Sequence, residues 1–192
     1  MTEASPSDRD AEDAKWVSLG EGRRLHLGGK DVRAGWEILN AQRADGVDHV
    51  GDIRDLSRFE EGTFAIVYAS HVFEHLGHQT DVQQALSGVL RVLQKGGKFM
   101  VSVPNLMTLA KLFSHPDVDE STRLHLMRMI FGGQTDAYDF HYVGFWFNYL
   151  ASLLSECGFT EVRRVKRFGI FEDSSTITVG GILISLNVVA VK

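Results

Sequence analysis

Short apolar runs recur along the first half of the chain, and each is followed by a small, polar or turn-forming residue. Runs bounded in this way are typical of buried β-strands. FAIVYAS, at residues 64–70, is a nearly continuous apolar run, as the central strands of parallel sheets are. The runs predict strands over residues 24–29, 36–40, 47–53, 64–70 and 98–104.

A helical pattern lies between the last two of these runs. Residues 81–97 repeat apolar side chains at helical spacing, and Gly96 and Gly97 follow. We expect a helix there that ends at the glycine pair. Strands that alternate with helices indicate an α/β domain with a parallel sheet.

The pattern changes after Pro104. The final apolar run alternates strongly and follows its predecessor without a helical pattern between them, so we expect it to pair antiparallel at the end of the sheet. The expected elements are helices over residues 106–113, 121–131 and 148–159, an irregular aromatic stretch over 132–146, and strands over 162–168 and 181–192.

Composition narrows the class of protein. The chain has 192 residues, 44% of them hydrophobic and 23% charged, with a net charge of −5. This fits one globular domain, and the negative charge argues against a broad basic face for nucleic acid. No apolar run approaches the roughly 18–20 residues of a membrane span. Cys157 is the single cysteine, so no intrachain disulfide forms and a cytoplasmic setting fits.

The first residues differ from the rest of the chain. MTEASPSDRDAEDAK, residues 1–15, is polar and acidic and has no apolar stretch. We predict a disordered lead-in there, not a signal peptide. Residues 16–192 are predicted to form a single domain.

Several segments together resemble a known family: LHLGG…GWEILN, VDHVGDIRDLSRFEEGTFAIVYASHVFEHL, LRVLQKGGKFMVSVPNL, FGGQ…HYVGF, ECGF and SLNVVAVK. In this order they resemble the class I S-adenosylmethionine-dependent methyltransferases, and most closely a small bacterial branch associated with sugar, polysaccharide or secondary-metabolite genes. The resemblance covers residues 23–192. It implies a Rossmann-like, mostly parallel sheet of seven strands with one antiparallel strand near the edge, helices on both faces, and S-adenosylmethionine across the carboxyl ends of the first strands.

The resemblance also implies which residues bind the cofactor. Gly28 and Gly29 let the backbone approach a ligand closely, although they also suit a tight turn without one. Asp52 would accept a hydrogen bond from the adenine amine, with Ile53 packed on the ring. The alternative for Asp52 is a solvated loop residue or a helix cap. Ser70 ends the fourth strand, which would face the methionine half of the cofactor.

The catalytic candidates are histidines. His71 would lie beside the reacting methyl group, where it serves either as the general base or as a structural residue bonded to a loop. His141 is the second candidate base, next to Asp139 and Tyr142. It lies in residues 105–147, the segment that usually forms the acceptor side, and the alternative is a loop packed by its own aromatic residues.

SHVFEHLGH, residues 70–78, also contains the H-x-x-E-H pattern of some zinc proteases. In a helix, His71 and His78 would lie about 10.5 Å apart along the axis, too far for both to join His75 on one ion. We therefore expect no metal site in this segment. Glu74 and His75 would instead brace the corner beside His71.

Two departures from the family pattern concern the cofactor. Lys30 takes the place of the third position of Gly-x-Gly, and a lysine there is unfavourable beside a sulfonium unless it reaches the cofactor's carboxylate. Asn40 replaces the acid that usually binds the ribose hydroxyls, and it lacks the charge of that acid. Both substitutions put cofactor affinity in doubt.

The expected function is methyl transfer from S-adenosylmethionine to the oxygen or nitrogen of a small polar acceptor, such as a sugar, nucleotide sugar or secondary metabolite. The alternative is a catalytically inactive scaffold subunit with the same fold, and a metal-dependent hydrolase is a third. Neither a nucleic acid nor a membrane is an expected partner. The chain is expected to be a monomer or a homodimer.

Overall fold

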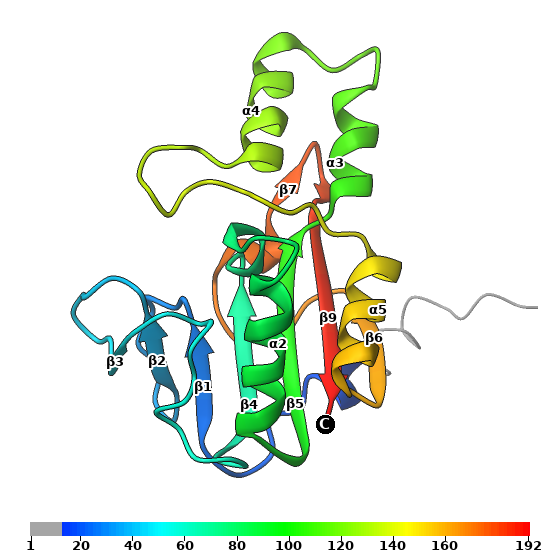
Figure 1. Ribbon diagram of the computed structural model, residues 1–192. Coiled ribbons are helices and arrows are strands. Elements are labelled where there is room, and N and C mark those ends of the chain that lie inside the picture. The colour runs from blue at the N-terminus through cyan, green and yellow to red at the C-terminus, as the bar shows by residue number, and fades with distance from the viewer. Residues whose placement is uncertain (1–12) are drawn as a thin grey trace, which may run out of the picture.

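The fold is built around one seven-stranded sheet with the order β3-β2-β1-β4-β5-β9-β6 (Figure 1). The computed structural model describes residues 13–192. All neighbouring strands are parallel except where β9 pairs antiparallel with β5 and with β6. The strands are β1 Arg24–Leu27, β2 Glu37–Asn40, β3 His49–Val50, β4 Phe64–Ser70, β5 Leu93–Pro104, β6 Glu161–Val165 and β9 Ser185–Val191.

The predicted seven-stranded sheet with one antiparallel strand is therefore confirmed. The antiparallel strand β9 lies next to the edge and not at the end of the sheet, because β6 pairs with its outer side. Seven residues of β9 are paired with β5, from Pro104↔Ser185 to Lys98↔Val191. This places the start of β9 beside the carboxyl end of β5.

Besides the helical residues 13–16, the described part of the chain contains the α-helices α2 Asp81–Val92, α3 Leu106–Phe113, α4 Glu120–Phe131 and α5 Phe147–Cys157. Helices α2 and α5 lie against one face, while α3 and α4 form a hairpin beyond the carboxyl ends of the strands (Figure 1). Asp119 caps α4 by accepting a hydrogen bond from the Thr122 N–H at 2.8 Å. Gly158 ends α5 in a left-handed conformation. No described helix has both the length and the apolar character needed to cross a membrane.

Strand β4 separates two hydrophobic clusters. Phe64, Val67 and Ala69 pack toward α2 and α5, and Ile66 and Tyr68 point to the opposite face. That opposite face is covered by a helical turn at residues 13–16 and by an irregular segment at 166–177, which includes the short helix η2 Ser174–Thr176. Among residues 13–192, the long α-helices that pack on the sheet are thus found on one face.

The end of helix α2 differs from the prediction, which placed it at Gly96-Gly97. The helix ends at Val92, and Leu93 is extended, fully buried and paired with Phe64. The helix therefore ends before Leu93, because this residue is buried in the sheet instead. Gly96 has a φ of 75° and donates its N–H to the Lys192 carbonyl, so it forms a turn near the C-terminus.

Other predicted boundaries shift as well. Strand β6 ends at Val165, and the predicted strand over 181–192 is divided into β8 Ile182–Leu183, which pairs with β7 Thr178–Val179, and β9. Of the predicted lead-in, residues 1–12 lie outside the described part. Residues 13–15 belong to the helical turn, where Asp13 accepts the Lys166 N–H at 2.8 Å.

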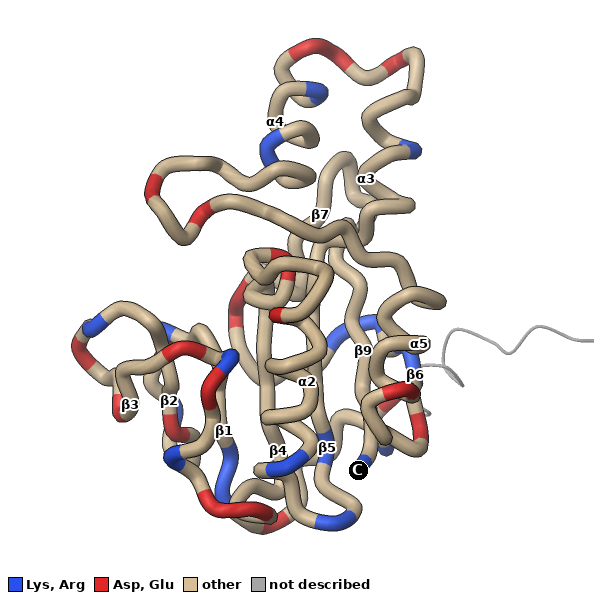
Figure 2. The backbone as a smooth tube through the Cα atoms, viewed as in Figure 1, with Lys and Arg blue, Asp and Glu red and all other residues tan. Residues whose placement is uncertain are grey.

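Charged side chains are spread over the loops and the strand ends (Figure 2). Acidic and basic residues alternate around β1, β2 and β3, where Glu37 pairs with Arg23 at 2.8 Å and with His49 at 3.0 Å. These exposed or half-exposed pairs contribute little to stability. The core is instead the two apolar layers on the faces of β4.

His26 is a buried titratable residue in β1, with 4% of its surface exposed. Its ring centroid lies 5.0 Å from that of Tyr68 and 4.3 Å from that of Phe171. Its Nδ1 atom has no hydrogen-bond partner among the described residues. Burial lowers the pKa of His26 to about 4, because the charged form cannot be solvated there.

His26 should therefore make the fold sensitive to acid. Between pH 6.5 and 4 the unfolded chain binds a proton at His26 that the folded chain does not, so the free energy of unfolding falls by about 2–3 kcal/mol near pH 4.5. Denaturant titrations from pH 7.5 to 4.5 should show this loss in the wild type and in the exposed control His125→Phe. The loss should be smaller by about 2–3 kcal/mol in His26→Phe, where His71, whose pKa is also lowered to about 4, still contributes. Parallel curves for all three proteins would refute the assignment.

Candidate functional site

A cavity of about 750 Å³ opens at the carboxyl ends of β1, β2 and β4. This volume is in the range of small-molecule sites, about 300–1,000 Å³. Residues after the strands form its floor, and residues 135–142, between α4 and α5, form its roof. The predicted residues that line it are Gly28, Asn40, Asp52, Ile53 and His71.

The turn after β1 leaves space for no side chain. Gly28 has a φ of 71°, and a Cβ atom there would lie 2.4 Å from Cγ2 of Val72. A Cβ atom on Gly29 would lie 2.4 Å from Nδ1 of His26. Gly28 borders the cavity, whereas Gly29 is not among its lining residues. Both glycines are thus required by close packing, and Gly28 also by its backbone conformation.

Asn40, at the end of β2, holds this turn in place. Its Nδ2 atom donates to the carbonyls of Gly28 at 3.1 Å and Gly29 at 3.0 Å, and its Oδ1 atom accepts from the Gln42 N–H at 2.9 Å. A carboxylate could not donate to the two carbonyls. The structure therefore gives a local reason for asparagine at this position, where both amide protons are bonded within the protein.

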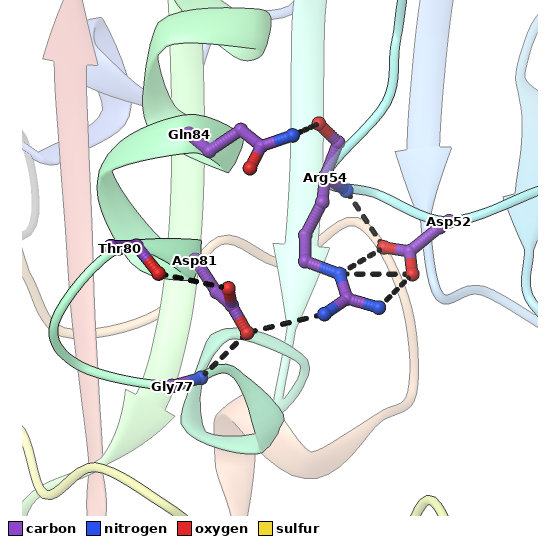
Figure 3. Close-up of polar contacts among 6 residues, drawn as sticks. All are labelled: Asp52, Arg54, Gly77, Thr80, Asp81 and Gln84. Carbon is purple, nitrogen blue, oxygen red and sulfur yellow. Dashed lines mark hydrogen bonds and ion pairs between the residues drawn. The ribbon is translucent and has the colours of Figure 1, made fainter.

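Asp52 is bound by a neighbouring arginine (Figure 3). The Arg54 side chain donates to Asp52 from Nε at 2.9 Å, and its Nη1 atom lies 3.2 Å from Oδ2 of Asp81, the first residue of α2. These hydrogen bonds hold the pKa of Asp52 below its usual range. Ile53, with 7% of its surface exposed, lines the cavity beside this ion-pair cluster.

The segment after β4 contains the most constrained residue of the site. His71 has a φ of 52°, which is uncommon for a residue with a side chain. Its Nε2 atom lies 3.0 Å from Oγ of Ser185, and Ser185 in turn donates to the Ser174 carbonyl. Nε2 is therefore the nitrogen that donates, and Nδ1 carries the lone pair. Burial lowers the pKa of His71 to about 4, so the ring is neutral at neutral pH.

The remaining two predicted residues lie outside the cavity lining. The Ser70 hydroxyl is buried and has no hydrogen-bond partner among the described residues. His141 is half-buried behind the roof, where its Nδ1 atom contacts the Met129 carbonyl at 3.1 Å. Burial lowers the pKa of His141. Its ring centroid is 4.8 Å from that of His75, which does line the cavity.

Other residues of the site were not singled out from the sequence. Val72 fills the space above Gly28, Arg54 binds Asp52, and Asp81 in turn binds Arg54. The Asp-x-Arg spacing at 52–54 could have indicated this pair, since an aspartate in a turn often accepts from the residue two positions later. No sequence pattern pointed to Ser185, because it contacts His71 from the far end of the chain.

Known proteins share parts of this chain's sequence and its whole fold. Residues 31–101 match a family described as "Methyltransferase domain". A methyltransferase from Archaeoglobus fulgidus has a TM-score of 0.57 and 16% identity over 96% of this chain and 94% of its own. A possible histamine N-methyltransferase from Thermotoga maritima has a TM-score of 0.55 and 17% identity over 96% of this chain and 88% of its own.

A trans-methyltransferase named CalH, solved in complex with SAH, has a TM-score of 0.55 and 15% identity; the match covers 95% of this chain and 55% of that protein. No curated protein matches this chain in sequence. The solved structures show the fold: an α/β Rossmann-like methyltransferase fold with a mostly parallel seven-stranded sheet.

The role of Asn40 can be tested by a single-atom change. Asn40→Asp should lower the free energy of unfolding by about 2–3 kcal/mol at pH 7.5, because a carboxylate would then face two carbonyl oxygens. Acidification to pH 4 should reduce the difference from wild type, since the protonated acid can donate. Asn148→Asp, an exposed change in the first turn of α5, should have little effect. Equal denaturation midpoints for both variants would contradict the role.

Proposed function

We propose that this protein transfers a methyl group from S-adenosylmethionine to the oxygen or nitrogen atom of a small polar acceptor. The observation that carries the proposal is the cavity at the carboxyl ends of β1, β2 and β4, where open α/β sheets bind their ligands. The family match over residues 31–101 supports it, since that segment contributes most of the floor.

The residues of the floor fit the cofactor. Gly28 presents bare backbone, Ile53 an apolar surface, and Asp52 and Gln42 polar groups. Asp52 and Ile53 would hold the adenine, and Lys30 would hold the carboxylate. When bound, S-adenosylmethionine supplies a methyl group on a positively charged sulfur.

The roof is suited to a polar acceptor. Tyr138, Asp139 and Tyr142 line it together with His75. This mixture of aromatic and hydrogen-bonding groups fits a sugar, a nucleotide sugar or a polar secondary metabolite better than an apolar molecule. Catalysis would consist mainly of holding the acceptor in line with the methyl group.

His71 stays the predicted base on the cavity side. Its low pKa keeps it unprotonated at neutral pH, as a base requires. However, its Nε2 atom is bonded to Ser185, and its Nδ1 atom lies 3.4 Å from Oε1 of Glu74. These contacts favour a positioning role, in which His71 fixes the corner between β4 and the cavity. His141 would reach the acceptor only through a movement of the roof.

Titration calorimetry with S-adenosylhomocysteine tests the cofactor site. The wild type should bind with a micromolar dissociation constant, and Gly28→Ala should weaken binding at least about tenfold, since the new Cβ displaces Val72 at the cavity wall. Gly62→Ala is the matched control: its φ is 66°, and a Cβ there would meet nothing within 4 Å. It carries the same backbone strain and should bind normally. Equal losses in both variants would mean that strain alone weakens binding.

A second candidate function has its own support. Both amide protons of Asn40 are bonded to the glycine turn, and the Asp52 carboxylate is bonded to Arg54. Two polar groups expected to bind the cofactor are thus engaged within the protein. This favours a scaffold subunit with the methyltransferase fold. No detectable binding of S-adenosylhomocysteine at millimolar concentration would support the scaffold function and contradict the proposed enzymatic function.

The charge of Lys30 can affect cofactor binding in two ways, and a substitution distinguishes them. If it pairs with the carboxylate, Lys30→Met should weaken S-adenosylmethionine and S-adenosylhomocysteine equally, by about tenfold. If it repels the sulfonium, the variant should bind S-adenosylmethionine more tightly and leave S-adenosylhomocysteine unchanged. We expect the first result. Lys95→Met, at the opposite end of the sheet, is the control, and calorimetry with both ligands measures the ratio.

A further inference from the structure

Three potential metal ligands from two distant segments meet beside the cavity. Glu74 and His75 belong to the short helix η1 Phe73–His75, and His141 belongs to the stretch after α4. One ligand atom from each of the three side chains lies within 4.8 Å of the other two. The centroids of the two imidazole rings are 4.8 Å apart.

The backbone holds the two segments together. The N–H of Tyr142 donates to the Glu74 carbonyl at 2.8 Å, and the N–H of His141 donates to the Phe131 carbonyl at 3.1 Å. A Cβ atom on Gly132 would lie 2.2 Å from the Asp139 carbonyl oxygen, so the chain turns back here without space for a side chain. The approach of His141 to His75 is therefore fixed by main-chain contacts.

Both imidazoles are oriented as metal-binding histidines are. Nδ1 of His75 lies 3.0 Å from the Phe140 carbonyl, and Nδ1 of His141 lies 3.1 Å from the Met129 carbonyl. A carbonyl only accepts, so each Nδ1 carries the proton and each Nε2 carries the lone pair. Hydrogen bonds of this kind commonly set the tautomer of histidine ligands.

Glu74 gives the second, independent indication. Its side chain is 1% exposed, and both carboxyl oxygens are buried without a hydrogen-bond partner among the described residues. Nδ1 of His71 lies 3.4 Å from Oε1. A buried carboxyl group without partners is costly, and carboxylates in such places are normally paired or bound to a metal.

The donor set suits one kind of ion. Two imidazole nitrogens and one carboxylate oxygen match zinc and iron(II), whereas magnesium and calcium prefer oxygen ligands alone. Metal–ligand bonds of about 2.0–2.1 Å place tetrahedral ligands about 3.3 Å apart. Side-chain movements on the order of 1 Å would bring the three ligand atoms to that separation from within 4.8 Å.

We propose that Glu74, His75 and His141 form a binding site for one divalent transition-metal ion, with an open coordination position on the cavity side. This ligand set differs from the His71, His75 and His78 set weighed from the sequence, because the third ligand comes from the roof. His75 lines the cavity. An oxygen atom of the acceptor would therefore be the ligand that occupies the open position. That last step rests on the proposed function; the metal site itself does not.

Cobalt(II) is the probe for the test. Untagged full-length protein, stripped with a chelator, should bind one cobalt ion per chain and give visible d–d absorption bands, which zinc should abolish by displacement. Glu74→Gln and His141→Gln should weaken cobalt binding at least about tenfold. His125→Gln, an exposed change on α4, should bind as the wild type does.

Two results would overturn the metal site: no saturable cobalt binding by the wild type, or equal affinity in Glu74→Gln, His141→Gln and His125→Gln. Circular dichroism checks that each variant is folded. If Glu74→Gln does not fold, His75→Gln, at a partly exposed position, replaces it. Binding of S-adenosylhomocysteine, measured on the same stripped protein, reports separately on the cofactor site.

Discussion

The shortness of the connections between β1, β2 and β3 is the constraint on which the rest of the structure depends. Parallel strands are usually joined by a crossover of a dozen or more residues that contains a helix. Here residues 28–36 join β1 to β2, and residues 41–48 join β2 to β3, without a helix. The connection from β1 closes because Gly28 and Gly29 turn tightly and Asn40 donates to both of their carbonyls.

A consequence of these short crossovers is that one face of the sheet must be covered by other parts of the chain. The segment at residues 166–177 supplies Phe168, Ile170 and Phe171, and the N-terminal turn adds Trp16. The same segment leads into the serines that support the site, since Ser174 accepts from Ser185 and Ser185 contacts His71. Covering the bare face and fixing His71 are therefore two results of one arrangement.

Much of the fold follows from local patterns in the sequence. The apolar run at 64–70 is a central strand, and the order of strands and helices leads to the seven-stranded sheet. The end of α2 could not be found in this way. Leu93 continues the helical spacing, but its burial opposite Phe64 in the sheet decides its conformation. A choice between two ways of burying one side chain depends on tertiary packing.

The site was predictable in position and less so in detail. Gly28, Asp52, Ile53 and His71 follow strands whose ends meet, so the sequence places them together, and all four line the cavity. The hydrogen bonds of Asn40 to the glycine turn could not be read from a pattern. Neither could the contact of His75 with His141, because it joins residues far apart in sequence through a loop without regular structure.

The roof of the cavity, residues 135–142, is held next to the buried carboxyl group of Glu74. Tyr142 lines the cavity and also donates its N–H to the carbonyl of Glu74. A movement of the roof would therefore pull on η1 and change the environment of Glu74, His75 and His141 together. The roof and the polar cluster beside it are thus coupled through the Glu74 carbonyl, which accepts from the N–H of Tyr142 at 2.8 Å and from the N–H of Val143 at 3.4 Å.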